Sequence, residues 1–295
     1  MRSGYDPAPT RIYLIASMTD TQATIAAPAR QAADGQTPGK PHIEVRSLTM
    51  AYDSVVVMRN VHFTVNRGDI FFIVGPSGSG KSTLMRHMIG LNEPVEGEVL
   101  YDGVSFTRAD ADTRDAMLRN FGVSYQGGAL FSSMTLAENI AMPLAEYTDL
   151  NHAERMEIAA LKLSWVGLKG FEDYYPSEIS GGMQKRAALA RALALDPDVL
   201  FFDEPSSGLD PVSSSLLDDL ILQLRDNLGA TIVIVSHELP SIFRIGTNSV
   251  YLDVETRTQA AVGNPRYLLE HCDNPRVHSF LTRRAQFERS ARNHG

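Results

Sequence analysis

The chain has 295 residues, of which 43% are hydrophobic and 21% charged, the balance of an ordinary globular protein. This length suits one large α/β domain or two closely joined subdomains. The net charge of −8 argues against a non-specific nucleic-acid binder, because such proteins need a basic surface to displace counterions from phosphates. The single cysteine, Cys272, excludes an internal disulfide and a multi-cysteine zinc site.

The first forty residues differ in composition from the rest of the chain. They are rich in Ala, Thr, Gln, Gly and Pro and lack a sustained apolar period, so residues 1–40 are predicted to be a disordered leader. The apolar patch within Arg11–Ala16 is too short for a signal-peptide core. No stretch reaches the roughly 18 to 20 apolar residues of a membrane-spanning helix. We therefore expect any action on a membrane to come from outside the bilayer.

Hydrophobic periodicity predicts strands first and then helices. From Ile43 to Val65 apolar and polar residues alternate, which indicates half-buried strands in an antiparallel layer. Ile70–Val74 is continuously apolar and suits a strand buried on both faces of a parallel sheet. The pattern then becomes helical between residues 126 and 195, with one helix over Asn151–Leu168 and a largely buried one over Gly181–Leu195.

The last third returns to strands and helices. Val199–Phe202 and Thr231–Val235 are predicted to be buried strands on either side of a helix. Asp210-Pro211 offers that helix an N-cap and a first-turn proline, and Gly229 closes it. The remaining predicted elements are a hairpin over Tyr251–Val262 and two short helices that start at Asn264-Pro265 and Asn274-Pro275.

A glycine-rich loop carries the clearest chemical signal. The segment Gly75-Pro76-Ser77-Gly78-Ser79-Gly80-Lys81-Ser82, followed by Thr83, fits the phosphate-binding loop pattern and lies between a buried strand and a helix. Its glycines let backbone N–H groups turn inward as an anion nest, at the positive end of the following helix. We expect Lys81 to reach the β and γ phosphates and the Ser82 hydroxyl to take one position on Mg²⁺. A chance Gly-Ser turn would fit at about one in a hundred, so the loop predicts ATP and Mg²⁺ as cofactors.

Two carboxylates end a later hydrophobic strand. In Val199–Glu204, Asp203 can hold Mg²⁺ through water and Glu204 can orient or polarise an attacking water. The alternative is a solvated acidic turn, which the presence of the phosphate loop disfavours. The pair therefore predicts a nucleotide hydrolase.

A serine and two glycines open the predicted buried helix. In Ile179-Ser180-Gly181-Gly182-Met183-Gln184-Lys185-Arg186, Ser180 is an N-cap and the N–H groups behind it form a second anion site. With this segment the chain resembles the ABC ATPase family, whose signature is Leu-Ser-Gly-Gly-Gln. Met183 stands in place of the signature Gln, and its thioether is a poor hydrogen-bond partner for a ribose.

The resemblance implies a fold and a set of residue roles. The fold is α/β, a P-loop NTPase core of the ABC ATPase type with an antiparallel β subdomain and an inserted α-helical subdomain at about 127–195. The domain would span residues 41–281, followed by a C-terminal tail over 282–295. Tyr52 would stack on adenine, Gln126 would sense Mg²⁺, Asp210 would lie in the dimer-contact loop and His237 would contact the γ phosphate. By chemistry alone, Tyr52 fits packing in a β-sheet equally well.

Finer matches point to a subgroup. The segments Gly181–Arg186, Gln126–Phe131, Ser133–Asn139 and Asn274–Leu281 resemble the ATPases of Mce-associated lipid transporters, the Mla-type systems of bacterial envelopes. That resemblance implies a homodimer, an integral-membrane permease and an Mce-domain lipid-binding protein as partners. It implies no nucleic acid, and a peripheral position on the cytoplasmic face of the bacterial inner membrane.

The predicted function is ATP hydrolysis coupled to transport, with Glu204, His237 and Lys81 as catalytic residues. The main alternative is the ATPase of a polar-solute importer, such as one for amino acids. A soluble ABC ATPase acting on DNA or ribosomes is disfavoured, because Gln126 and Ile179 are 53 positions apart and leave no room for a long coiled coil. A non-hydrolysing regulator is disfavoured by Glu204. The permease is expected to dock after Gln126, where Leu130 and Phe131 suit docking and core packing equally.

Overall fold

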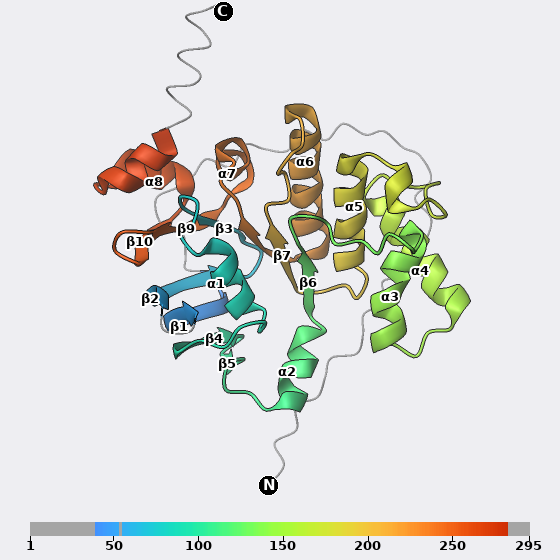
Figure 1. Ribbon diagram of the computed structural model, residues 1–295, viewed down its shortest axis with the longest axis horizontal. Helices are drawn as coiled ribbons and strands as arrows, with labels where there is room; N and C mark the ends of the chain where they lie inside the picture. The colour runs from blue at the N-terminus through green and yellow to red at the C-terminus, as the bar shows by residue number, and fades with distance from the viewer. Residues whose placement is uncertain (1–38, 53–54, 283–295) are drawn as a thin grey trace, which may run out of the picture. The chain divides into compact units, whose positions relative to one another are not determined.

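The computed structural model describes residues 39–52 and 55–282. The predicted leader and tail lie outside this part, except for residues 39, 40 and 282, and so does the side chain of Tyr52. The described residues form two β-sheets with helices around them (Figure 1). The strands are β1 (Pro41–Tyr52), β2 (Val55–Asn66), β3 (Ile70–Val74), β4 (Glu96–Tyr101), β5 (Val104–Ser105), β6 (Phe121–Ser124), β7 (Val199–Asp203), β8 (Thr231–Val235), β9 (Asn248–Asp253) and β10 (Thr258–Gly263).

The helices lie in the chain between the strands and after the last of them. They are α1 (Lys81–Met88), α2 (Ala111–Leu118), α3 (Leu136–Tyr147), α4 (His152–Trp165), the 3₁₀ turn η1 (Pro176–Glu178), α5 (Gly181–Ala192), α6 (Pro211–Leu228), α7 (Leu239–Ile245) and α8 (Pro265–His271). Residues 275–282 are also helical. No helix within the described ranges is both long and apolar enough to cross a bilayer.

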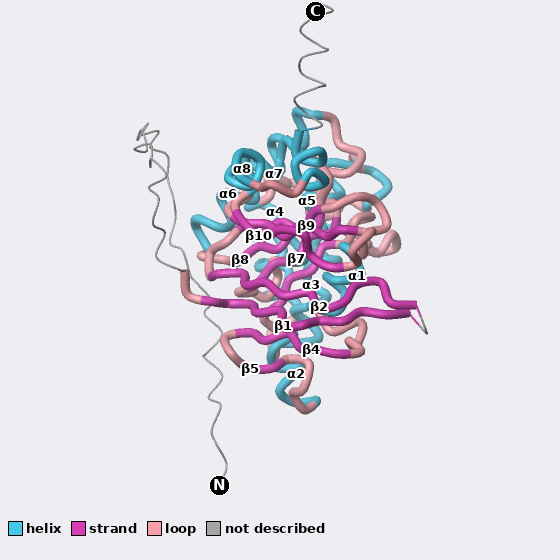
Figure 2. The backbone as a smooth tube through the Cα atoms, turned by 90° about the vertical axis from the view of Figure 1, so that its left-hand side faces the viewer, coloured by secondary structure: helices cyan, strands magenta, loops and turns pink. Residues whose placement is uncertain are grey.

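The alternating segment near the start of the described chain forms an antiparallel sheet, as predicted. Its strand order is β2-β1-β4-β5, and every pair in it is antiparallel. Figure 2 shows this sheet as a layer apart from the larger one. The two layers share a core in which Phe63 of β2 stacks on Phe71 of β3 with ring centroids 5.1 Å apart. The ring pair therefore ties the small sheet to the large one.

The larger sheet is parallel apart from one edge. Its order is β10-β9-β3-β8-β7-β6, and β10 alone pairs antiparallel, with β9. Side chains alternate along β3: Ile70, Phe72 and Val74 pack into the helical layer, while Phe71 and Ile73 face the antiparallel sheet and α1. All five are buried, which confirms a strand covered on both faces and explains why its sequence is continuously apolar.

Local sequence signals set the helix boundaries. α3 and α4 each begin with a capping box, Thr135 with Glu138 and Asn151 with Glu154. Asp210 caps α6 through the N–H groups of the first turn, as predicted. The helix predicted to run from Gly181 to Leu195 ends earlier, at Ala192, because the chain turns there towards β7.

A buried lysine joins the helical region to the sheet. Lys162 of α4 is only 2% exposed and forms an ion pair with Asp196, which lies in the turn before β7. Its ammonium also lies 3.9 Å from the ring centroid of Trp165. Trp165 thus provides an aromatic face for a cation. The contacts fix α4 relative to the strand that ends in Asp203.

Candidate active site

The strands of the parallel sheet bring the predicted motifs to one edge. β3, β8, β7 and β6 are neighbours in the sheet, and their carboxyl ends lead to Gly75, His237, the pair Asp203–Glu204, and Gln126 respectively. Ligands of open α/β sheets bind at this edge. Topology therefore assembles residues that lie up to 162 positions apart in the chain.

Close packing dictates the glycines of the phosphate loop. Gly75 has φ of +148°, and a Cβ there would lie 2.5 Å from the carbonyl oxygen of Leu252. Gly80, the N-cap of α1, has φ of +79°, and a Cβ on it would lie 2.8 Å from Cγ1 of Val57. Side chains at either position would displace the loop or its neighbours. The loop thus needs glycine at both ends to bring its backbone N–H groups round a ligand.

Lys81 points back along its own loop. Its Nζ donates to the carbonyl oxygens of Gly75 and Pro76, both at 3.0 Å. Burial lowers the pKa of Lys81, whereas the carboxylates of Glu204 and Asp203 raise it. An ammonium has three donors, so Lys81 retains one for a ligand at the mouth of the loop.

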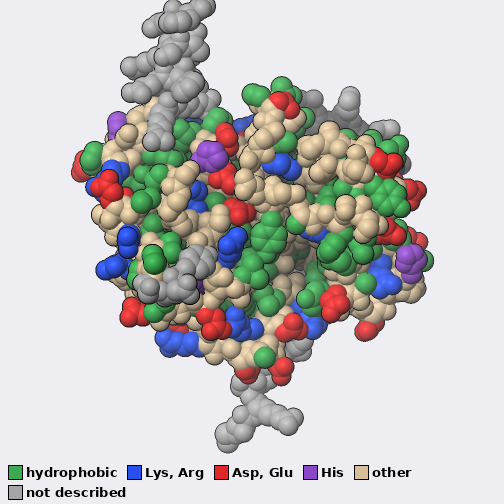
Figure 3. Space-filling model, in the orientation of Figure 1, with side chains coloured by type: hydrophobic (Ala, Val, Ile, Leu, Met, Phe, Trp, Pro, Cys, Tyr) green, Lys and Arg blue, Asp and Glu red, His purple; other side chains and the backbone are tan. Residues whose placement is uncertain are grey.

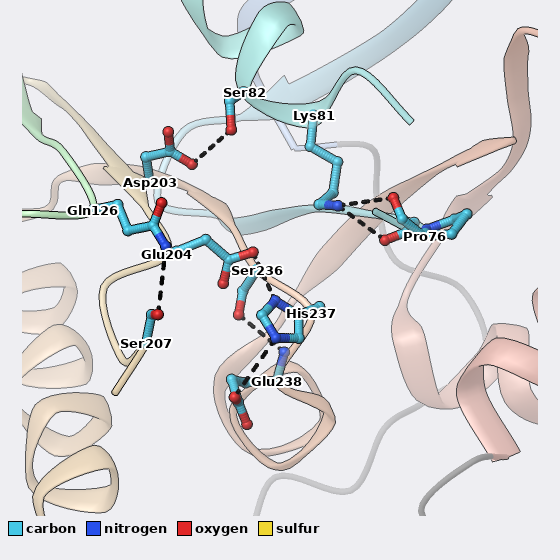
Figure 4. A network of polar contacts seen from close by, with 11 residues as sticks. Pro76, Lys81, Ser82, Gln126, Asp203, Glu204, Ser207, Ser236, His237 and Glu238 are labelled. Carbon is cyan, nitrogen blue, oxygen red and sulfur yellow. Dashed lines mark hydrogen bonds and ion pairs between the residues drawn. The ribbon is translucent and has the colours of Figure 1, made fainter. Parts of the chain in front are cut away.

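Ser82 and Asp203 meet across the site. The Ser82 hydroxyl donates to the Asp203 carboxylate at 3.0 Å, joining the start of α1 to the end of β7 (Figure 4). Burial raises the pKa of Asp203, while the Ser82 hydrogen bond and the charges of Arg86 and Lys81 lower it. Arg86 was not singled out from the sequence, although its i,i+4 spacing from Ser82 places it on the same face of α1. A hydroxyl and a carboxylate side by side are the hard oxygen donors that Mg²⁺ prefers, so these residues fit that ion.

Glu204 is held in an uncommon backbone conformation. Its φ is +50°, a left-handed region that costs a non-glycine residue about 1–2 kcal/mol. Its N–H donates to the carbonyl of Val235 at 2.8 Å, which holds the turn against β8. One carboxylate oxygen is 2.8 Å from Nδ1 of His237, and the other is buried without a partner among the described residues. The strained turn therefore holds one carboxylate oxygen buried and without a partner among the described residues.

Gln126 and Lys185 converge on the segment after Glu204. Nε2 of Gln126 lies 3.5 Å from the Ser207 hydroxyl (Figure 4), and Nζ of Lys185 donates to the Ser207 carbonyl. Burial lowers the pKa of Lys185, and Glu204 opposes this shift. The contacts connect β6 and α5 to the strand end that carries the carboxylates. Sequence reasoning quoted Lys185 only as part of a motif and missed this role.

The start of the signature segment, at Ser180, Gly181 and Gly182, lies apart from this network. Ser180 is exposed and accepts from the N–H of Met183 at 3.3 Å as the N-cap of α5. An added Cβ on Gly181 would meet no atom within 4 Å, and Gly182 lies nearest Leu209. No hydrogen bond described for the structured residues joins Ser180 to residues 75–82. The segment therefore presents its helix N-terminus outward.

The two residues that follow the signature glycines act within the chain. Gln184 donates to the carbonyl of Pro176 at 2.8 Å, so its amide holds the turn before the signature. Met183 packs against the helical core.

Asp210 accepts from the N–H groups of Val212 and Ser213, both at 3.0 Å, as the cap of α6. The hydroxyl of Ser213 lowers the pKa of Asp210. This carboxylate thus serves its own helix. Its predicted place in a dimer-contact loop stays a prediction, as does the predicted stacking of Tyr52 on adenine.

A phosphate loop, a Ser–Asp pair and a Glu–His pair at the carboxyl edge of a parallel sheet define a P-loop nucleoside triphosphatase. Residues 58–207 match the family model described as ABC transporter. The chain therefore belongs to the ABC transporter family, and it is an ATP-binding, ATP-hydrolysing subunit of that family, as the sequence predicted.

Curated relatives cover most of the chain. It is 40% identical over 251 residues to the probable ribonucleotide transport ATP-binding protein mkl of Mycobacterium leprae, which covers 85% of this chain and 72% of the relative. It is 38% identical over 239 residues to the intermembrane phospholipid transport system ATP-binding protein MlaF of Escherichia coli, covering 81% and 88%.

Solved structures confirm the fold class. The dimeric ATP-binding cassette MJ0796, in a post-hydrolysis state bound to ADP and Pi, superposes with a TM-score of 0.68 at 29% identity, covering 75% of this chain and 97% of that one. The cbiO1 protein of Clostridium perfringens superposes with a TM-score of 0.69 at 24% identity, covering 82% and 99%. The latter likeness shows the fold alone.

Proposed function

We propose that this chain powers phospholipid transport in a bacterial envelope. The observation that carries the proposal is its 38% identity to MlaF over 88% of that protein, whose name specifies intermembrane phospholipid transport. The Mla-type signature Gly181–Arg186 supports the same assignment. The mycobacterial relative is named for ribonucleotide transport, which favours a polar solute as the second candidate substrate.

The active site is proposed to form between two copies of the chain. Ser180 and Gly181 are open to solvent, while Lys81 and Glu204 lie in the other half of the site. The relative MJ0796 is a dimer with ADP and Pi, which supports a homodimer here. In this arrangement each triphosphate lies between the phosphate loop of one copy and Ser180, Gly181 and Gly182 of the other.

Each residue of the phosphate half then has a proposed role. Ser82 and Asp203, with Gln126 beside them, would hold Mg²⁺, which would supply positive charge to the phosphate oxygens. Lys81 neutralises charge on the β and γ phosphates, and the free oxygen of Glu204 orients the attacking water.

His237 completes the proposed constellation. It would orient Glu204 through their 2.8 Å contact, and its exposed ring is proposed to contact the γ phosphate. Tyr52 stacks on adenine at the end of β1.

The permease is proposed to dock on the face beside Gln126. Phe131 is 46% exposed there, and Figure 3 shows hydrophobic side chains near the middle of this face. Leu130 is half-buried against the helical core. We therefore propose that Phe131 contacts the permease and that Leu130 packs in the core. The amide of Asn139, itself fully buried, accepts from the N–H of Phe131 and donates to its carbonyl, and Arg191 donates to the carbonyl of Ala129. A rigidly held apolar side chain suits a permease helix.

This docking places the chain at the cytoplasmic face of the inner membrane as a peripheral subunit. Purification of the full chain from solubilised membranes should recover a permease together with an Mce-domain protein, and the captured complex should hydrolyse ATP faster with phospholipid than with ribonucleotide. Phe131→Glu should abolish recovery of the permease. Leu161→Glu, at an equally exposed position on α4, should not. A complex stimulated by ribonucleotide and indifferent to phospholipid would favour the second candidate.

A further inference from the structure

Strand β2 packs directly on the phosphate loop. Gly80, the last glycine of that loop, would place an added Cβ 2.8 Å from Cγ1 of Val57. The position of β2 is therefore coupled to that of the loop by van der Waals contact, since neither side can move inward. Figure 2 shows β1 and β2 running towards the side of the molecule where α1 lies.

One edge of β2 pairs with β1, and the opposite edge is held by the turn that joins β9 to β10. The N–H of Arg59 donates to the carbonyl of Arg257 at 2.8 Å, and Nη1 of Arg257 donates to the carbonyl of Val56 at 3.1 Å. Further along, the N–H of His62 donates to the amide oxygen of Gln259 at 3.2 Å. β2 and β10 are the edge strands of their sheets, so these bonds join the two sheets edge to edge.

The hydrogen bonds between Arg257 and β2 lie next to Tyr52, the residue proposed to stack on adenine. Val55 pairs with Tyr52 and Val56 pairs with Ala51, so the carbonyl that Arg257 binds lies one residue from the partner of Tyr52. Arg257 itself has φ of +52°, an uncommon conformation that turns its side chain and carbonyl to the same strand. A guanidinium bound to a carbonyl oxygen is a charge-assisted hydrogen bond, stronger than a neutral one.

We propose that Arg257 is a positioning residue for the nucleotide base. By holding β2, it fixes the distance between the backbone of Tyr52 and the phosphate loop. The inference rests on the stacking of adenine on Tyr52 in the proposed function. Arg257 contacts neither Glu204 nor Lys81, so its loss weakens ATP binding and leaves the chemical step unchanged.

The test separates the contribution of the base to binding from that of the phosphates. Binding of Mg-ATP and of Mg-tripolyphosphate, which has no base, is measured by calorimetry on the full chain in a Glu204→Gln background, and kcat and KM for ATP are measured without that background. Arg257→Ala should raise the Kd and KM for ATP about three- to tenfold, the range of one exposed charge-assisted bond. The Kd for tripolyphosphate and kcat should stay within about twofold of the parent. Arg257→Lys, whose ammonium can still donate to the Val56 carbonyl, should recover most of the ATP affinity.

Arg266→Ala is the matched control. Arg266 also donates to a backbone carbonyl, that of Phe243 at 2.6 Å, but it lies on α8. It should change none of the constants. Unchanged ATP affinity in Arg257→Ala would overturn the inference, and so would an equal loss of ATP and tripolyphosphate affinity, because a merely structural role weakens both. Failure of the unsubstituted chain to bind Mg-ATP would instead overturn the proposed function.

Discussion

The two halves of the nucleotide site are built differently. The phosphate half is assembled within one chain: Ser82 binds Asp203, Lys81 binds its own loop, and Glu204 binds His237. The signature half is exposed, and Ser180 is bound only to its own helix.

In the proposed dimer, this difference separates what a single chain holds in place from what the second copy supplies. Buried and strained groups persist only where their surroundings fix them, as the sheet fixes Glu204. A helix N-terminus with free N–H groups needs no such support and keeps its donors open for an anion. In the proposed dimer, a change in either half should therefore disable both sites of a homodimer, whereas a mixed dimer can combine the intact phosphate half of one copy with the intact signature half of the other.

The largest effect is expected at Glu204. Glu204→Gln keeps the shape of the side chain but removes the carboxylate that orders water, so turnover should fall at least ~100-fold while ATP still binds. Steady-state kinetics and calorimetry measure the two quantities. Turnover close to that of the parent would remove Glu204 from the mechanism.

Mixed dimers test whether the halves come from different chains. Ser180→Arg and Lys81→Ala should each reduce ATPase activity at least about tenfold, since each disables both sites of a homodimer. An equal mixture should regain about one quarter of the parent activity, because half the dimers are mixed and each has one intact site. Absence of any recovery, with mixed dimers demonstrated by differential tags, would count against a shared site.

The buried lysine should matter for stability and not for the phosphate half. Lys162→Ala removes both the ion pair with Asp196 and the contact with Trp165, and should lower the free energy of unfolding by about 1–3 kcal/mol. The loss is below that of a fully buried pair because Asp196 is 39% exposed and regains water. Urea denaturation measures it, with exposed Lys169→Ala as the control. A loss of ATP affinity in Lys162→Ala would contradict this expectation, because it would show that Lys162 also supports the phosphate half.

The smallest effect concerns pH and the scaffold beneath the phosphate half. His42 of β1 is buried, and the Thr231 hydroxyl of β8 bonds its Nδ1 at 2.7 Å while accepting from the N–H of Gly68. Burial first, and then the charge of Arg67, lower the pKa of His42.

The unfolded chain consequently binds a proton at higher pH than the folded one. Stability should be complete above the ordinary histidine pKa and should decline as pH falls below it. Urea denaturation at pH 7.5 and 5.5 tests this. His42→Gln should lose less stability between the two pH values, and an equal loss would contradict the assignment.

Sequence predicted the phosphate half better than its surroundings. Gly75–Ser82, Asp203 and Glu204 lie where a strand meets a loop, and such junctions carry their own pattern of glycine, apolar run and carboxylate. The contacts of Lys185 with Ser207 and of Arg257 with Val56 could not be predicted, because each joins segments far apart in sequence through a backbone carbonyl that any residue provides. The roles of Tyr52 and Asp210 stay predictions.

The most direct test of the central claim is the mass of the Glu204→Gln chain with and without Mg-ATP. If each chain holds only half of a nucleotide site, ATP should convert a species of 32.4 kDa into one of twice that mass, and Lys81→Ala should prevent the change. A chain that binds Mg-ATP, hydrolyses it without the substitution and yet remains a monomer throughout would contradict the account.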